Sequence, residues 1–245
     1  MDPSTIILVI VALAVVALIA NRGDRDPAPT PWPSATVISA SDSAGGWYDV
    51  DAEVLRHMEP DPVQMINQAG PVQCVNWSIN GLRLAELMRG GSVADGVGRD
   101  GRQGLTVLPL REQLVQMATP IVIVGAWMND AIRTDLPADD FRHLVRECIA
   151  ECAAAGKHLV LRGQQGFVES PIVTPVALQR IAQFGEILRE EARAAGITLL
   201  DPLLAGPPEI CSDGLHGTEA YMRRIAATLA VQLQAAALRY QGSQA

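Results

Sequence analysis

The sequence predicts an α/β fold, a three-layer sandwich with helices on both faces of a parallel sheet of about five strands. Two observations carry the prediction. Short β-branched and aliphatic runs alternate with longer stretches rich in Ala, Leu, Glu and Arg, the pattern of successive βαβ units. Hydrophobic residues make up 49% of the 245 residues and aromatic ones only 4%, which suits a buried parallel sheet under Ala- and Leu-rich helices.

Each element follows from a local pattern. The expected strands are residues 36–38, 72–75, 120–124, 158–161 and 197–200. The expected helices are residues 81–89, 139–155, 175–195 and about 218–238. The last helix places Tyr221, Ile225, Leu229 and Leu233 along one face at steps of four. In such a sheet, ligands bind beyond the carboxyl ends of the strands.

The N-terminal residues 1–22 are expected to form a single membrane-anchor helix. Residues 6–20 are an unbroken apolar run, slightly short against the roughly 17–25 residues that usually span a bilayer. A cleaved signal peptide fits less well, because Asp2 replaces the basic start and Leu18 stands where a small residue is needed for cleavage. Residues 23–35 are proline-rich and read as an extended linker, which leaves residues 36–240 as the folded domain.

Composition argues against several other functions. The net charge of −8, with no cluster of Lys and Arg, argues against nucleic-acid binding. The four cysteines, Cys74, Cys148, Cys152 and Cys211, are interpreted as structural thiols, although a zinc site at Cys148 and Cys152 is conceivable. No cluster has metal-ligand spacing, and we expect neither a metal nor a cofactor. Residues 90–104 are rich in glycine but lack the flanking strand and helix of a phosphate-binding loop. We therefore expect them to form a surface loop that connects two elements.

Polar residues follow four of the five expected strands. Asp42 and Ser43 come after the first strand, and Gly81 follows the second. Asn129 and Asp130 follow the third, and Asp213 and His216 stand between the fifth and the last helix. Singly these are ordinary caps and turns. Together, and in this order, they predict an acyl-transfer site.

On these residues the sequence resembles the SGNH hydrolase superfamily, the GDSL-type esterases and lipases, from about Thr36 to Leu238. The resemblance implies an SGNH/flavodoxin-like fold with Ser43 as the nucleophile. It also implies a catalytic triad of Ser43, Asp213 and His216. The implied oxyanion hole consists of the backbone N–H groups of Ser43 and Gly81 and the side-chain amide of Asn129.

Each of these roles has a chemical reason. A serine hydroxyl is a poor nucleophile until an adjacent base accepts its proton, and histidine is suited to accept and return it. Asp213, three residues before His216, can hold the imidazole in the right tautomer. Gly81 suits an oxyanion hole because no Cβ blocks close approach.

Two positions depart from the family pattern. Ser41 stands where a glycine normally precedes the Asp-Ser pair, and Ser39 and Ser41 alternate with Ser43, so a shift of register would change the nucleophile. Trp127 stands where a glycine normally lies two residues before the Asn. Either that loop carries two extra residues or Trp127 lines the pocket.

The remaining histidines and aromatic residues have ordinary interpretations. His57 and His143 are expected on solvated helical stretches, and His158 in a structural position. For Trp47 and Tyr48, packing on the sheet and lining an acyl pocket are equally open.

We therefore expect a serine hydrolase that cleaves a carboxylic ester, of the esterase/lipase or carbohydrate deacetylase type. Its substrate is expected to be a small-molecule or glycan ester. The alternative is a catalytically silent SGNH-like domain that binds a glycan or a protein partner at the membrane, and acyl transfer to a sugar stays open. Arg22 and Arg25 after the anchor weakly favour a cytoplasmic domain. Anchored hydrolases of this family are often exported, and the exported side is preferred here.

Overall fold

The computed structural model of the chain describes residues 31–39, 46–49, 54–57, 60–93 and 104–244. The expected anchor at residues 1–22 and most of the linker lie outside these residues, as does Ser43. Within the described parts of the chain, no helix has both the length and the apolar character that a membrane crossing requires.

The centre of the domain is a five-stranded sheet in the order β4-β1-β7-β8-β9. All four neighbouring pairs are parallel. The strands are β1 (Ala35–Ser39), β4 (Cys74–Asn76), β7 (Ile121–Gly125), β8 (His158–Arg162) and β9 (Thr198–Leu200). The five strands expected from the sequence are confirmed, each within a few residues of its predicted bounds.

Strand β7 shows why both faces of the sheet are covered. All five of its residues are buried. Ile121 and Ile123 pack into one hydrophobic cluster, whereas Val122 and Val124 pack into the other. Because side chains alternate along a strand, a continuous apolar run contributes to the hydrophobic clusters on both faces of the sheet.

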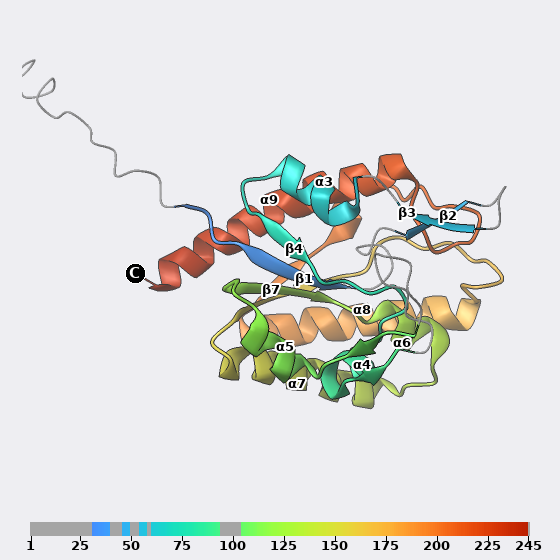
Figure 1. The fold of residues 1–245 in the computed structure, drawn as a ribbon. Coiled ribbons are helices and arrows are strands. Elements are labelled where there is room, and N and C mark those ends of the chain that lie inside the picture. Colours follow the sequence, from blue (N-terminus) through green and yellow to red (C-terminus); the bar gives the residue numbers. More distant parts are fainter. Residues whose placement is uncertain (1–30, 40–45, 50–53, 58–59, 94–103, 245) are drawn as a thin grey trace, which may run out of the picture. The chain divides into compact units, whose positions relative to one another are not determined.

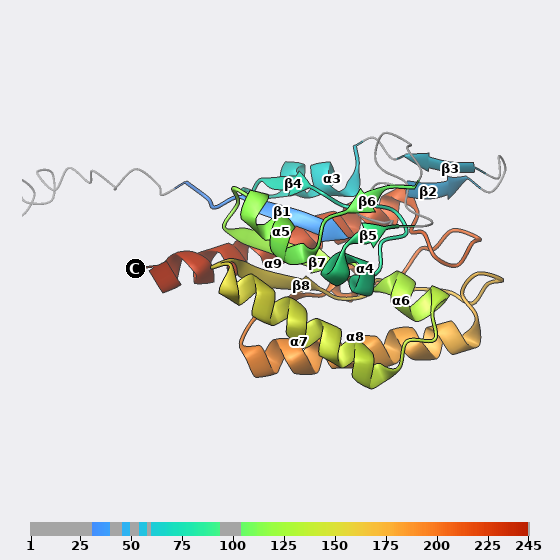
Figure 2. The same cartoon turned by 60° about the horizontal axis from the view of Figure 1, so that its bottom comes forward.

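Helices α3 (Pro62–Ala69) and α9 (Glu219–Gln244) cover one face of the sheet. The other face is covered by α4 (Leu84–Arg89), α5 (Leu110–Gln116), α6 (Met128–Arg133), α7 (Ala138–Ala154) and α8 (Pro175–Ala195). Figures 1 and 2 show this three-layer arrangement, with α3 and α9 on one side and α7 and α8 on the other. The predicted α/β/α class is confirmed.

The long helices carry recognisable start and stop signals. In α8, the Thr174 side chain accepts from Ala177 N–H, Pro175 occupies the first turn, and Gly196 ends the helix with φ of 67°. In α9, the predicted apolar face is confirmed, because Tyr221, Ile225, Leu229 and Leu233 are all buried.

Several short elements were not expected. They are α3, α5 and α6, the antiparallel pair β2 (Gly46–Asp49) and β3 (Val54–His57), the short pair β5 (Gly91–Ser92) and β6 (Thr106–Val107), and the 3-10 helix η1 (Pro202–Ala205). The expectation that His57 lies on a helical stretch was wrong, because His57 ends strand β3. His143 lies in α7 and His158 begins β8, as expected.

All four cysteines are free thiols, and Cys74, Cys148 and Cys152 are buried. The described residues contain no group of three or more His, Cys, Asp or Glu side chains placed to hold a metal ion. In the part of the chain described here, Cys148 and Cys152 are therefore packing residues of α7, within the core against α8.

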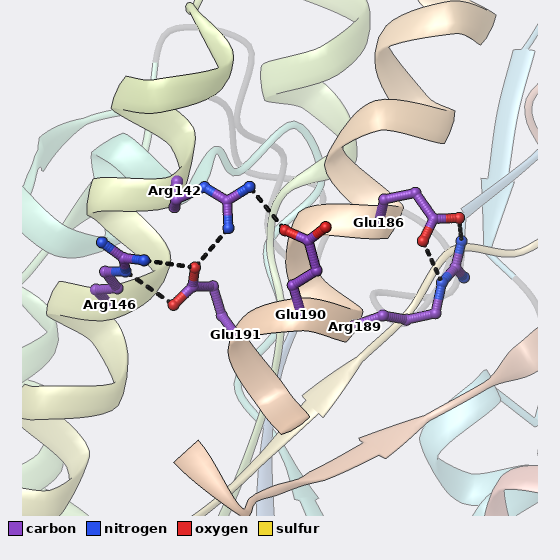
Figure 3. A network of polar contacts seen from close by, with 6 residues as sticks. All are labelled: Arg142, Arg146, Glu186, Arg189, Glu190 and Glu191. Atoms are coloured by element: carbon purple, nitrogen blue, oxygen red, sulfur yellow. Dashed lines mark hydrogen bonds and ion pairs between the residues drawn. The ribbon is translucent and has the colours of Figure 1, made fainter. Parts of the chain in front are cut away.

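A charged network joins the two outer helices α7 and α8 (Figure 3). Glu191, whose side chain is 7% exposed, accepts from Arg142 at 2.6 Å and from Arg146 at 2.8 Å. Hydrogen bonds from Arg146 lower the pKa of Glu191, and those from Arg142 add to the effect against the opposing influence of burial. A second pair, Glu186 with Arg189, lies within α8 alone and is more exposed.

We expect Glu191→Gln to reduce the free energy of unfolding by about 1–2 kcal/mol, because it removes a charged acceptor shared by two guanidinium groups. Urea unfolding at neutral pH measures the change. The matched control is Glu186→Gln, which should lie within experimental error of the native protein. Equal effects of the two substitutions would contradict a role for Glu191 in joining the two helices.

Candidate active site

Asp213 and His216 form a hydrogen-bonded pair in a turn before α9. The Oδ2 atom of Asp213 lies 2.5 Å from Nδ1 of His216. Both residues are buried, and Nε2 of His216 has no hydrogen-bond partner among the described residues. An imidazole held at one nitrogen by a carboxylate, with the other nitrogen unengaged, is the arrangement of a general base.

The turn is organised around the Asp213 carboxylate. Its Oδ1 atom accepts the backbone N–H groups of Leu215 at 2.9 Å and His216 at 3.0 Å. Burial alone would raise the pKa of Asp213, but the hydrogen bonds from the His216 ring and from the two backbone groups outweigh it and lower the pKa. Asp213 is therefore an anion at neutral pH, in direct contact with the His216 ring.

Gly81 lies in the loop after β4 and Asn129 lies near the start of helix α6, and the structure brings these two segments together. Gly81 has φ of 79°, a conformation that favours glycine. The Asn129 side chain donates from Nδ2 to the Leu82 carbonyl at 3.2 Å. The next residue, Asp130, accepts the Leu84 N–H at 2.7 Å. Two adjacent side chains of α6 thus bind the loop after β4.

The loop that contains Gly81 follows the carboxyl end of β4, and α6 follows the carboxyl end of β7. Both of these strands pair with β1. Strand β1 ends at Ser39, four residues before Ser43 in the sequence. Ser43 and Asp42 lie outside the described residues, so their assignment stays a prediction.

Trp127 lies in the core, directly before α6. It is 2% exposed, and its ring centre lies 6.2 Å from that of Phe141. Its indole N–H donates to the Arg162 carbonyl at the end of β8, at 2.9 Å. Trp127 also lines a small apolar cavity together with Val124 and Leu161. Because Ser43 lies outside the described residues, the two alternatives for this loop stay predictions.

Sequence reasoning missed polar residues at the same edge of the sheet. Asn80 is 4% exposed, and neither polar atom of its side chain has a hydrogen-bond partner in the described segments. Gln165, three residues after β8, is 2% exposed and donates to the Leu215 carbonyl at 3.1 Å. The sequence carries a signal for both, because each residue follows a strand at its carboxyl end.

A separate surface pocket of about 350 Å³ lies between α4 and α6. Arg83, Glu86 and Arg89 line one wall, and Asp130 and Thr134 the other. Neither Asp213 nor His216 lines this pocket, so it is distinct from the candidate base.

No protein-family model and no curated protein matches the sequence. Among solved structures, the chain is similar to an inhibitor-bound aryl esterase of M. smegmatis, at 14% identity and TM-score 0.65, covering 83% of this chain and 99% of that one. A protein assigned to the lipolytic G-D-S-L family from Desulfitobacterium hafniense aligns at 13% identity and TM-score 0.60, covering 82% and 99%. The chain has the SGNH hydrolase fold.

A carbohydrate acetylesterase from Sinorhizobium meliloti shares this SGNH fold at 11% identity and TM-score 0.62, over 83% of this chain and 99% of that one. The alignments cover almost the whole of each solved structure. The SGNH fold thus accounts for the sheet, its order and the covering helices described above.

Asp130 should give the stability of the domain a measurable pH dependence. Burial raises the pKa of Asp130 from 3.8 to about 7, although the backbone N–H groups of Leu84 and Ala85 oppose the change. Between about pH 4 and pH 7, the Asp130 carboxyl is therefore protonated in the folded state but ionised in the unfolded state. Over this range the free energy of unfolding falls as pH rises.

We expect Asp130→Asn to remove this part of the pH dependence, which is on the order of a few kcal/mol. Chemical unfolding at several pH values measures it. Asp135→Asn, at a fully exposed side chain, is the control and should follow the native curve. Parallel curves for the native protein and Asp130→Asn would exclude a proton held by Asp130.

Proposed function

We propose that the chain is a serine hydrolase that cleaves a carboxylic ester through an acyl-enzyme on Ser43. The observation that carries the proposal is the Asp213–His216 pair, in which Nδ1 is engaged and Nε2 has no partner within the part of the chain that the structure describes. The SGNH fold supports it, because the solved structures with this fold include esterases.

The proposed reaction begins with attack of Ser43 Oγ on the ester carbonyl carbon. His216 Nε2 takes the hydroxyl proton as the new C–O bond forms. Asp213 accepts the Nδ1–H group and stabilises the resulting imidazolium. The bond to the alcohol then breaks, and His216 returns the proton to the departing oxygen. Water repeats the sequence on the acyl-enzyme and releases the acid.

The negative oxygen of the tetrahedral intermediate needs donors that are already in position. We assign this role to the backbone N–H groups of Ser43 and Gly81 and to Nδ2 of Asn129. The hydrogen bond from Asn129 to Leu82 supports the assignment, because it holds this nitrogen one residue from Gly81. Loss of one such donor typically lowers turnover by about 10²–10³-fold.

The proposed substrate is a small-molecule or glycan ester. The carbohydrate acetylesterase among the structures with this fold makes an acetylated glycan a reasonable first substrate to assay. The proposed mechanism uses no metal and no cofactor.

We expect Ser43→Ala to lower kcat/KM on a small chromogenic acetate ester by at least about 10³-fold, because the nucleophile is lost. The matched control is Ser41→Ala, which tests the neighbouring register and should retain activity. Full turnover by Ser43→Ala would show that the nucleophile is another residue.

A catalytically silent binding domain is the second candidate. One observation favours it: Ser41 and Trp127 stand at two positions where the family pattern has glycine. Labelling with a fluorophosphonate separates the two candidates, since a hydrolase is modified at Ser43 whereas a binding domain does not react.

We further propose that residues 1–22 anchor the domain to a membrane, with the domain on the exported side. The apolar run of residues 6–20 supports the proposal. The full chain should sediment with membranes and resist extraction by high salt, and a chain beginning at residue 23 should not. Digestion of the domain by protease added outside intact cells tests the side, and protection there would overturn the exported assignment.

A further inference from the structure

Three successive carbonyls of the turn that carries Asp213 and His216 are bound by one segment, residues 165–173. The Ser170 hydroxyl donates to the Asp213 carbonyl at 2.6 Å. The Val168 N–H donates to the Gly214 carbonyl at 3.0 Å. The Gln165 side chain donates from Nε2 to the Leu215 carbonyl at 3.1 Å. The segment thus donates a hydrogen bond to the carbonyl of every peptide group between Asp213 and His216.

Gly214 permits this close approach. A Cβ atom at this position would lie 2.3 Å from the Val168 carbonyl oxygen and 2.6 Å from Ser170 Oγ. The residue also has φ of 74°, which strains any other side chain. The segment can therefore pack directly against the backbone of the turn only because residue 214 is glycine.

Ser170 holds the segment in shape as well as the turn. Its Oγ accepts the backbone N–H groups of Ile172 at 3.1 Å and Val173 at 2.9 Å, while its hydrogen goes to the Asp213 carbonyl. One hydroxyl therefore couples the bend of the segment to the turn. At the other end, the Gly166 N–H donates to the Tyr221 hydroxyl of α9 at 3.3 Å.

We propose that residues 165–173 form a clamp that sets the orientation of the Asp213–His216 pair, with Ser170 and Gln165 as positioning residues. The inference rests on the proposed function for its kinetic consequence. The side-chain directions of Asp213 and His216 follow from the peptide planes between them, and the clamp fixes those planes. A displacement of about 1 Å at a reacting group can cost on the order of 10²-fold in rate.

The kinetic test compares two pairs of variants. Ser170→Ala and Gln165→Met each remove one bond to the turn, and we expect each to lower kcat on the chromogenic ester by about tenfold or more with little change in KM. The matched controls are Thr174→Ala, which removes the cap of α8 nearby, and Gln164→Met, the adjacent glutamine. Neither control residue has a hydrogen bond to the turn, and both variants should keep kcat within about twofold of the native value.

A second readout does not require turnover. In native protein the Nδ1–H proton of His216, bonded to Asp213, should give a far-downfield NMR resonance, which is assigned by its loss in His216→Ala. Ser170→Ala and Gln165→Met should shift or broaden it, whereas the two controls should leave it unchanged.

The two proposals can fail separately. If the native protein cleaves no ester but the resonance responds to Ser170→Ala and Gln165→Met, the esterase proposal falls and the clamp stands. If the native protein is an esterase and both clamp variants match their controls in kcat and in the resonance, the clamp is overturned.

Discussion

The structure of the candidate site depends on one buried charge, the carboxylate of Asp213. A carboxylate removed from water is costly unless its oxygens are bound, and here each oxygen is engaged. One accepts two backbone N–H groups and so closes the turn, and the other accepts the His216 ring. The same group therefore determines the shape of the backbone and the orientation of the imidazole. Ser170 and Gln165, which bind the carbonyls of the turn, therefore contact a backbone whose shape this carboxylate defines.

A second set of bonds joins the loops on either side of β1. Asn129 and Asp130 are consecutive residues at the start of α6, and their side chains bind the carbonyl of Leu82 and the N–H of Leu84. The buried Trp127 beneath them donates to β8. In the sheet order these bonds connect the segments that follow the two neighbours of β1, because β4 and β7 flank β1, the strand that leads toward the predicted nucleophile Ser43. The SGNH fold thus brings loops far apart in the sequence to one edge of one sheet.

The sheet and the long helices could be predicted because their signals are local. Apolar runs of strand length and caps such as Thr174 with Pro175 are visible in a window of a few residues. The short helices α3, α5 and α6 are only 8, 7 and 6 residues long, too short for a helical period to stand out. The pairing of Asp213 with His216 was predictable because three residues on a tight turn suffice to form it. The contacts of Ser170 and Gln165 were not, because they join segments more than 40 residues apart and depend on how two loops pack.

The proposed chemistry requires Ser43, His216 and Asp213 to meet in one cleft. A crystal structure of the full domain after reaction with a phosphonate ester tests this directly. We expect phosphorus bonded to Ser43 Oγ, His216 Nε2 within hydrogen-bonding reach of that oxygen, and the phosphoryl oxygen facing Gly81 and Asn129. A structure that places Ser43 far from His216, or that carries the phosphonate on a different side chain, would contradict it.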